Sequence, residues 1–227
     1  MSRATTHDPT KERSKLRNRT RVQATAPPGQ ARKPLISVFG SSQVQSGSEL
    51  YNVGHEMGRL LGAMGCEVMT GGYTGVMEAV SKGAHQVGAH VIGVTMGRFA
   101  DRVNRFVVDE IRTANFYERF HYLIEKADGY VALGGGIGTL AEVSFAWQEI
   151  LIGMVPRRPL VLVGADWRAM YESWCAHMVP MEHLFEPLTL VATPAAAADF
   201  LREWFAPLSD GDAAGRRSAG TRPRPVA

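Results

Sequence analysis

The chain has 227 residues, of which 45% are hydrophobic and 21% are charged, so it is long enough to bury a core within one domain. Of its formal net charge of +3, +7 lies in residues 1–33 and +2 in residues 208–227, which leaves −6 for residues 34–207. An acidic central part argues against a general DNA- or RNA-binding surface, and no segment approaches the roughly 20 apolar residues of a membrane span. We therefore expect no specific nucleic-acid partner and no membrane partner.

Both ends of the chain are basic and poor in large apolar side chains. Such segments bury too little apolar surface to offset the entropy lost on ordering. We predict disordered tails at 1–33 and 208–227 around a single domain at 34–207. The start has no apolar run of signal-peptide length, and Cys66 and Cys175 have no metal or redox spacing, so we expect a cytoplasmic location.

Short apolar runs alternate with helical periodicity throughout the central part. Near-continuously apolar runs, typical of buried parallel strands, occur at 35–39, 66–70, 90–95, 129–133, 159–163 and 188–192. Apolar spacings of three and four predict helices at 48–64, 76–88, 115–127, 139–152, 167–178 and 195–205. This alternation predicts an α/β fold with a doubly wound, mostly parallel sheet and helices on both faces.

Glycine and hydroxyl residues follow several of the predicted strands. Ser41 and Ser42 follow the first strand, "TGGYTG" (Thr70 to Gly75) ends the second, and "GGGIGT" (Gly134 to Thr139) follows the fourth. Sheets of this kind bind ligands outside the carboxyl ends of their strands. These loops are therefore expected at the same edge of the sheet.

A glycine loop before a helix is suited to binding an anion. Glycine permits backbone angles and close approaches that a Cβ forbids, and a helix N-terminus supplies unpaired amides and a positive dipole end. We predict a phosphate site from residues that share this setting: Gly135, Gly136, Ile137, Gly138, Thr139, Gly71, Gly72, Ser41 and Ser42. The histidines show no metal spacing, and we expect neither a metal nor a cofactor.

Other interpretations of the glycine segment stay open. The glycines can simply form a tight turn. Thr139 and Glu142 also match a capping box, in which the acid at the third helical position bonds back to the N-cap amide. Residues 136–141 match the dinucleotide pattern G-x-G-x-x-A, but the expected acid at the end of the next strand is absent, because Asp166 comes only after Gly164.

The ordered run of these motifs resembles the Lonely guy (LOG) family of cytokinin riboside 5′-monophosphate phosphoribohydrolases. The segment "GGGIGTLAE" is similar to the family signature P-G-G-x-G-T-x-x-E. Similar segments are "VFGSS", "TGGYTGVMEAVSKGA", "GAHVIGV" and "FYERFHYLIEKADGYVAL", so the resemblance covers roughly residues 35–192. It implies a Rossmann-like homodimer without a cofactor that hydrolyses the bond between a base and ribose 5-phosphate, with Arg119 and Glu142 as catalytic pair.

The chain departs from the family pattern at two positions. Gly134 replaces a proline, which predicts a more flexible loop, and Phe120 replaces the lysine that follows the motif arginine. Related proteins of this fold include a molybdenum cofactor carrier, so the alternative is a non-catalytic protein that binds or carries a nucleotide or phosphorylated cofactor.

Cleavage of an N-glycosidic bond passes through an oxocarbenium-like sugar, which a carboxylate near C1 stabilises. Glu142 follows the predicted phosphate loop and is expected in this role. Arg119 would pair with the phosphate or hold Glu142 ionised. With the resemblance, we expect hydrolysis of a purine-type nucleoside 5′-monophosphate, either a cytokinin riboside monophosphate or an AMP-like substrate. The sequence does not identify the base itself.

Overall fold

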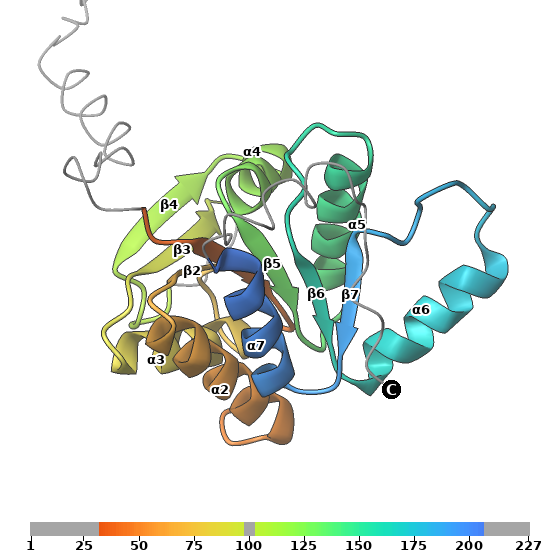
Figure 1. Cartoon of the computed structure of the whole chain (residues 1–227). Coiled ribbons are helices and arrows are strands. Elements are labelled where there is room, and N and C mark those ends of the chain that lie inside the picture. Colours follow the sequence, from red (N-terminus) through yellow and green to blue (C-terminus); the bar gives the residue numbers. More distant parts are fainter. Residues whose placement is uncertain (1–31, 98–102, 207–227) are drawn as a thin grey trace, which may run out of the picture. The chain divides into compact units, whose positions relative to one another are not determined.

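The computed structural model describes residues 32–97 and 103–206 (Figure 1). Nearly all of the two predicted tails lies outside these residues. In chain order the elements are β1 (Leu35–Phe39), α2 (Glu49–Ala63), β2 (Glu67–Thr70), α3 (Val76–Gln86), β3 (Val91–Met96), β4 (Asp109–Thr113), α4 (Phe116–Phe120), the π-helix η1 (His121–Glu125), β5 (Gly129–Ala132), α5 (Ile137–Leu151), β6 (Leu160–Val163), α6 (Ala165–His177), β7 (Leu188–Val191) and α7 (Pro194–Phe205).

The seven strands form one sheet in the order β4-β3-β2-β1-β5-β6-β7, and every neighbouring pair is parallel. In the centre of the sheet, Ile36 of β1 lies opposite Val68 of β2 on one side and Gly129 of β5 on the other. The six predicted strands are all present, and the predicted α/β fold with a parallel sheet is confirmed.

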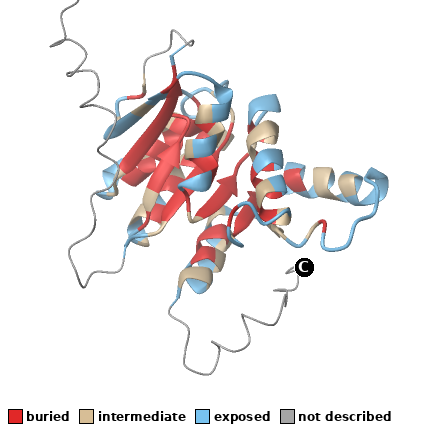
Figure 2. Ribbon diagram, turned by 90° about the horizontal axis from the view of Figure 1, so that it is seen from above, coloured by how far each residue is buried: buried red, intermediate tan, exposed pale blue. Residues whose placement is uncertain are grey.

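Helices cover both faces of the sheet, because successive side chains of each buried strand point to opposite faces. On one face, Ile36 and Val38 pack with apolar residues of α2, α3 and α7. On the other face, Leu35 and Phe39 pack with residues of η1, α5 and α6. Figure 2 shows the buried strands between these two helical layers.

Two elements differ from the sequence-based prediction. Strand β4, with the sequence DEIRT, was expected as part of a long loop; it is an edge strand whose charged side chains are mostly exposed, so it lacks the apolar run of a buried strand. The single helix expected at 115–127 is a short α-helix followed by a π-helix. π-helical turns are rare in proteins, and those that occur are often found at functional sites.

Candidate functional site

The carboxyl ends of β1 and β5 lie where the strand order reverses. From β1 the chain adds β2, β3 and β4 on one side, and it then returns to add β5, β6 and β7 on the other. Doubly wound sheets bind ligands in the crevice at such a switch point. The predicted loops after β1 and β5 flank this crevice, and the loop after β2 is their neighbour.

Backbone hydrogen bonds join these three loops. The Ser41 amide donates to the Gly134 carbonyl at 3.1 Å, and the Val76 amide donates to the Ser41 carbonyl at 2.8 Å. The Thr74 hydroxyl donates to the Ser42 carbonyl at 3.1 Å. The loops therefore form one connected edge of the sheet.

The hydroxyls of Ser41 and Ser42 lie at this edge and both accept hydrogen bonds from Gln43. The Gln43 backbone amide donates to Ser41 Oγ, and its side-chain amide donates to Ser42 Oγ, each at 3.1 Å. A hydroxyl that accepts a bond can still donate its own proton. Both serines are therefore able to donate to a phosphate oxygen.

The glycine loop after β5 is open to solvent. Gly135, Gly136, Ile137 and Gly138 are exposed, whereas Thr139 is buried. A Cβ on Gly135 would clash with the Thr139 side chain, but a Cβ on Gly136 or Gly138 would have no neighbour within 4 Å. None of these glycines has a positive φ, so this loop does not use the left-handed angles that glycine permits.

Helix α5 begins at Ile137, two residues earlier than predicted, and its N-cap is Gly136. No side chain caps this N-terminus. Counted from Ile137, Thr139 is the third helical residue and Glu142 the sixth, so the capping-box interpretation is wrong. The first amides of α5 are left without a side-chain acceptor, which is the condition that favours an anion.

Arg119 and Glu142 form a buried ion pair beside this helix N-terminus. Arg119 Nη2 lies 3.5 Å from Glu142 Oε1, and the two side chains are 8% and 12% exposed. Arg119 comes from α4 and Glu142 from the second turn of α5. Two segments 23 positions apart in the sequence thus bring opposite charges together at the switch point.

The rest of the Arg119 guanidinium contacts the loop after β2 and the backbone of β3. Arg119 Nη1 donates to the Val94 carbonyl at 2.6 Å and to the Gly71 carbonyl at 3.3 Å. The guanidinium carbon lies 5.5 Å from the centre of the Tyr73 ring. A Cβ at Gly71 would clash with Arg119 Nη2, so this glycine makes room for the arginine.

Gly71 and Gly72 are therefore placed differently from the glycines after β5. Both are buried, and Gly72 has a positive φ of 79°. Their observed contacts are with protein groups, and their contact with a phosphate stays a prediction.

A model of the SLOG cluster4 family matches residues 33–165, more than half of the chain and a span that includes every candidate residue named above. The chain belongs to the SLOG cluster4 family. The expected relationship to the LOG proteins is thereby confirmed.

Individual relatives of this SLOG cluster4 protein have names that give different functions or none. An uncharacterized protein of Archaeoglobus fulgidus is 32% identical over 129 residues, 57% of this chain and 83% of that protein. The cytokinin riboside 5′-monophosphate phosphoribohydrolase of Mycobacterium tuberculosis is 29% identical over 119 residues, 51% of this chain and 63% of that enzyme, so the match spans less than two thirds of the enzyme. Among solved structures, the molybdenum cofactor carrier protein of Chlamydomonas reinhardtii is 25% identical with a TM-score of 0.61, over 78% of this chain and 100% of that chain.

The pKa of Glu142 is raised from 4.5 to about 7. The largest cause is burial, which removes water from the carboxylate, and the Arg119 charge acts in the opposite direction. A carboxyl group that titrates near neutral pH can both accept and return a proton under physiological conditions. Perturbed pKa values of this kind are typical of functional sites in clefts.

The structure shows what surrounds Phe120 and Gly134, the two positions that depart from the family signature. Phe120 stacks on Phe145 of α5 with ring centres 5.2 Å apart, and it lies 6.2 Å from Phe116. Its side chain thus joins α4 to α5 next to the ion pair. At Gly134, a Cβ would come within 2.9 Å of the Leu50 side chain, a contact that a leucine can relieve by moving.

The sequence analysis did not identify two residues that belong to or contact the loop after β2. Tyr73 was seen only as part of "TGGYTG"; its hydroxyl accepts from the Met96 amide at 2.7 Å and donates to the Met96 carbonyl at 3.1 Å. Asn104 lies in the segment that was expected to be a long loop, and it is buried against Gly72. An uncharged polar residue between charged and apolar neighbours gave no periodic signal that could have identified it.

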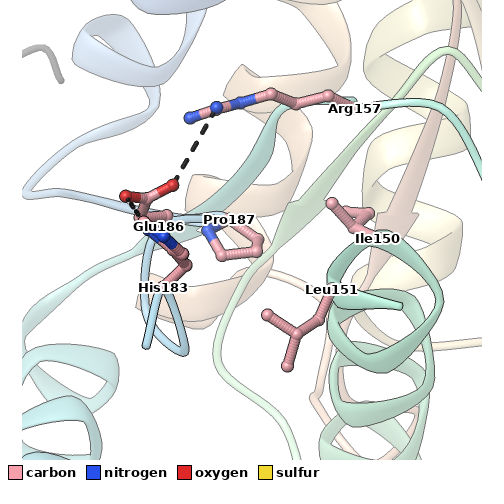
Figure 3. A pocket seen from close by; sticks show the side chains of 6 residues that line it. All are labelled: Ile150, Leu151, Arg157, His183, Glu186 and Pro187. Atoms are coloured by element: carbon pink, nitrogen blue, oxygen red, sulfur yellow. Dashed lines mark hydrogen bonds and ion pairs between the residues drawn. The ribbon is translucent and has the colours of Figure 1, made fainter. Parts of the chain in front are cut away.

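A separate cavity of about 140 Å³ lies at the other end of α5, lined by Ile150, Leu151, Arg157, His183, Glu186 and Pro187 (Figure 3). Its charged side chains pair with one another: His183 Nδ1 lies 2.7 Å and Arg157 Nη1 lies 4.0 Å from Glu186 carboxylate oxygens. A 15-residue helix is about 22 Å long, so this cavity is distant from the glycine loop.

Within residues 32–97 and 103–206, no group of three His, Cys, Asp or Glu side chains has the arrangement of a metal site. In the same part of the chain, no helix has the length and apolar character needed to span a bilayer.

Proposed function

We propose that this chain hydrolyses the N-glycosidic bond of a nucleoside 5′-monophosphate and releases the free base and ribose 5-phosphate. The observation that carries the proposal is the buried Arg119–Glu142 pair beside the exposed, uncapped N-terminus of α5. This arrangement combines an anion site with a carboxylate that titrates near neutral pH.

The 5′-phosphate would bind to the amides of residues 135–139. These residues surround the start of α5, where unpaired amides and the positive end of the helix dipole favour an anion. Ser41 and Ser42 would donate from the neighbouring loop. Open space at Gly136 and Gly138 leaves the backbone accessible to a phosphate oxygen.

Glu142 is the proposed base and electrostatic stabiliser. It lies four residues after Gly138, about 6 Å along the helix axis, which is on the scale of one ribose ring. As the bond between C1 and the base breaks, its electron pair leaves with the base, which takes up a proton from solvent. A water oxygen bonds to C1 and gives a proton to Glu142, whose negative charge stabilises the oxocarbenium-like sugar. Glu142 returns to solvent, at the end of the turnover, the proton that it receives from the attacking water.

Arg119 would act mainly by holding Glu142. Its Nη1 already donates to two backbone carbonyls, and its Nη2 faces the Glu142 carboxylate. The positive charge opposes the effect of burial and increases the fraction of Glu142 that is ionised at neutral pH. Replacement of Arg119 by alanine should therefore impair turnover by raising the pKa of Glu142 further.

The alternative function is that of a carrier that binds a phosphorylated cofactor without cleaving it. What supports it is the structural similarity to the Chlamydomonas molybdenum cofactor carrier, which covers 100% of that chain. A carrier would use the same helix N-terminus for the phosphate and would give Glu142 no catalytic task.

We further propose a homodimer located in the cytoplasm. Phe116 and Tyr117 of α4 and Phe145 of α5 are exposed large apolar side chains on neighbouring helices, as expected of a surface that a second copy covers. Both cysteines of the chain, Cys66 and Cys175, are free, which fits a reducing compartment. Light scattering on the wild type and on Phe145→Asp tests the dimer, because the charged variant should be monomeric.

A panel of nucleoside 5′-monophosphates tests hydrolysis against the carrier function. Purified protein is incubated with each nucleotide, and ribose 5-phosphate and free base are quantified. Equal amounts of both products from at least one nucleotide support the hydrolase. Tight binding of a phosphorylated ligand without release of ribose 5-phosphate from any nucleotide supports the carrier.

A further inference from the structure

Asn104, between β3 and β4, makes an unusually complete set of hydrogen bonds for a residue outside a helix or strand. It is 8% exposed. Its side-chain amide donates to the carbonyls of Gly72 at 3.1 Å and Tyr73 at 3.0 Å, and it lies 3.4 Å from Ser81 Oγ. Its backbone amide donates to the Gly72 carbonyl at 2.8 Å, and its Oδ1 accepts from the Phe106 amide at 3.2 Å.

These bonds fix the turn at Gly72 and Tyr73. The turn requires a positive φ of 79° at Gly72, and the Gly72 amide donates to Thr70 Oγ1 at 3.1 Å. Buried carbonyls that lose their donors destabilise the conformation that buries them. Without Asn104, the Gly72 and Tyr73 carbonyls would lose their side-chain donor in the interior.

The same turn contacts the Arg119 guanidinium. The Gly71 carbonyl accepts from Arg119 Nη1, and the Tyr73 ring lies under the guanidinium. Val94 supplies a further carbonyl from β3, a contact that does not depend on the turn. Displacement of the turn would therefore leave Arg119 attached at one end and free to tilt away from Glu142.

We propose that Asn104 is a positioning residue, which fixes the Gly72–Tyr73 turn so that Arg119 is held against Glu142. The role in catalysis rests on the proposed hydrolysis, whereas the control of the Arg119–Glu142 pair does not. Asn104 contacts neither member of the pair itself, and its effect passes through the backbone of the loop after β2.

Substitution of Asn104 tests this role. Asn104→Ala removes the whole amide without adding a charge and is the deciding variant. Asn104→Asp keeps the shape and the acceptor for the Phe106 amide and removes both donors, but its negative charge can raise the pKa of Glu142 directly. Ser81→Ala is the matched control, because it removes the 3.4 Å contacts of Ser81 Oγ with Asn104 and with Thr70 Oγ1 but leaves the bonds of Asn104 to Gly72 and Tyr73. Leu201→Ala, at a buried core position of α7, controls for a general loss of stability.

The readout is the titration of Glu142, followed by infrared or carbon NMR spectroscopy of labelled glutamate and assigned with Glu142→Gln. Both Asn104 variants should raise the pKa of Glu142 above the value of about 7 in the wild type, because Arg119 no longer offsets burial as effectively. They should lower kcat by about tenfold or more with little change in KM, since the geometry of the pair and not the phosphate site is altered. Both control variants should titrate like the wild type.

An unchanged pKa of Glu142 in folded Asn104→Ala would overturn the proposal, whether or not kcat falls. An equal rise of this pKa in Leu201→Ala would overturn it too, because the effect would then report lost stability. If the Asn104 variants alone raise the pKa but the wild type cleaves no nucleotide, positioning stands and the proposed hydrolysis fails.

Discussion

The loop after β2 and the loop after β5 are both rich in glycine and both precede a helix, yet their surroundings differ. In the loop after β2, Gly72 and Gly75 have positive φ, and added Cβ atoms would meet protein atoms. In the loop after β5, Gly136 and Gly138 have no positive φ and face open space. Similar sequences therefore have different surroundings: the first loop supports Arg119, and the second leaves the N-terminus of α5 without a side-chain cap, where we propose that a phosphate binds.

The largest effect on stability is expected in the loop after β2. Gly75 has a φ of 69°, and a Cβ there would clash with the Ser41 carbonyl. Gly75→Ala should lower the free energy of unfolding by about 2–4 kcal/mol, from the unfavourable φ and the backbone contact together. Urea denaturation measures this loss.

Gly47→Ala is the control for this substitution, because Gly47 has a φ of 88° but no atom within 4 Å of an added Cβ. Its cost should be about 1 kcal/mol, from the backbone angle alone. Equal losses for the two variants would contradict the account of a tightly packed loop after β2.

The loop after β5 should respond in the opposite way. Gly138→Val adds a side chain to open space at the start of α5, so stability should hardly change. Nucleotide affinity, measured by calorimetry, should fall about tenfold or more, because the side chain would occupy the space of the phosphate. Ser144 is also exposed on α5, so Ser144→Val is a control that introduces the same valine away from the glycine loop. This variant should bind the nucleotide like the wild type.

The pair between the two loops should produce a smaller, pH-dependent effect. The pKa of Glu142 is about 7 in the folded protein, above its ordinary value of 4.5, so the folded state binds more protons between these values. The free energy of unfolding of the wild type should therefore fall as pH rises from about 4.5 to about 7. Glu142→Gln should lack this decrease. If the free energy of unfolding changed with pH in the same way for both proteins, the raised pKa would be contradicted.

The smallest effect is expected from the ends of the chain. The basic charge lies outside residues 34–207, and the candidate site lies within them. A fragment of residues 34–207 should keep the melting temperature, oligomeric state and activity of the full chain. Salt-sensitive binding of DNA or RNA by the full chain, lost in the fragment, would instead assign the ends a nucleic-acid role.

The sequence predicted the central strands because β1, β5 and β6 are buried on both faces and read as continuous apolar runs. It did not predict β4, whose charged residues suit an exposed edge. Arg119 and Glu142 could be paired only through the family resemblance, because their proximity depends on how α4 and α5 pack in the folded chain. The difference between the two glycine loops was also hidden, since it depends on tertiary neighbours of the loop after β2 such as Asn104 and Arg119.

The most direct test of the proposed hydrolysis compares the wild type with Glu142→Gln, using release of ribose 5-phosphate from the best nucleotide of the panel. The substitution preserves shape but removes the charge that would face the oxocarbenium-like sugar. Turnover should fall about a hundredfold or more, while nucleotide affinity stays near that of the wild type. Equal turnover by the two proteins, or no release of ribose 5-phosphate by the wild type, would contradict the proposal that Glu142 cleaves a nucleotide at this site.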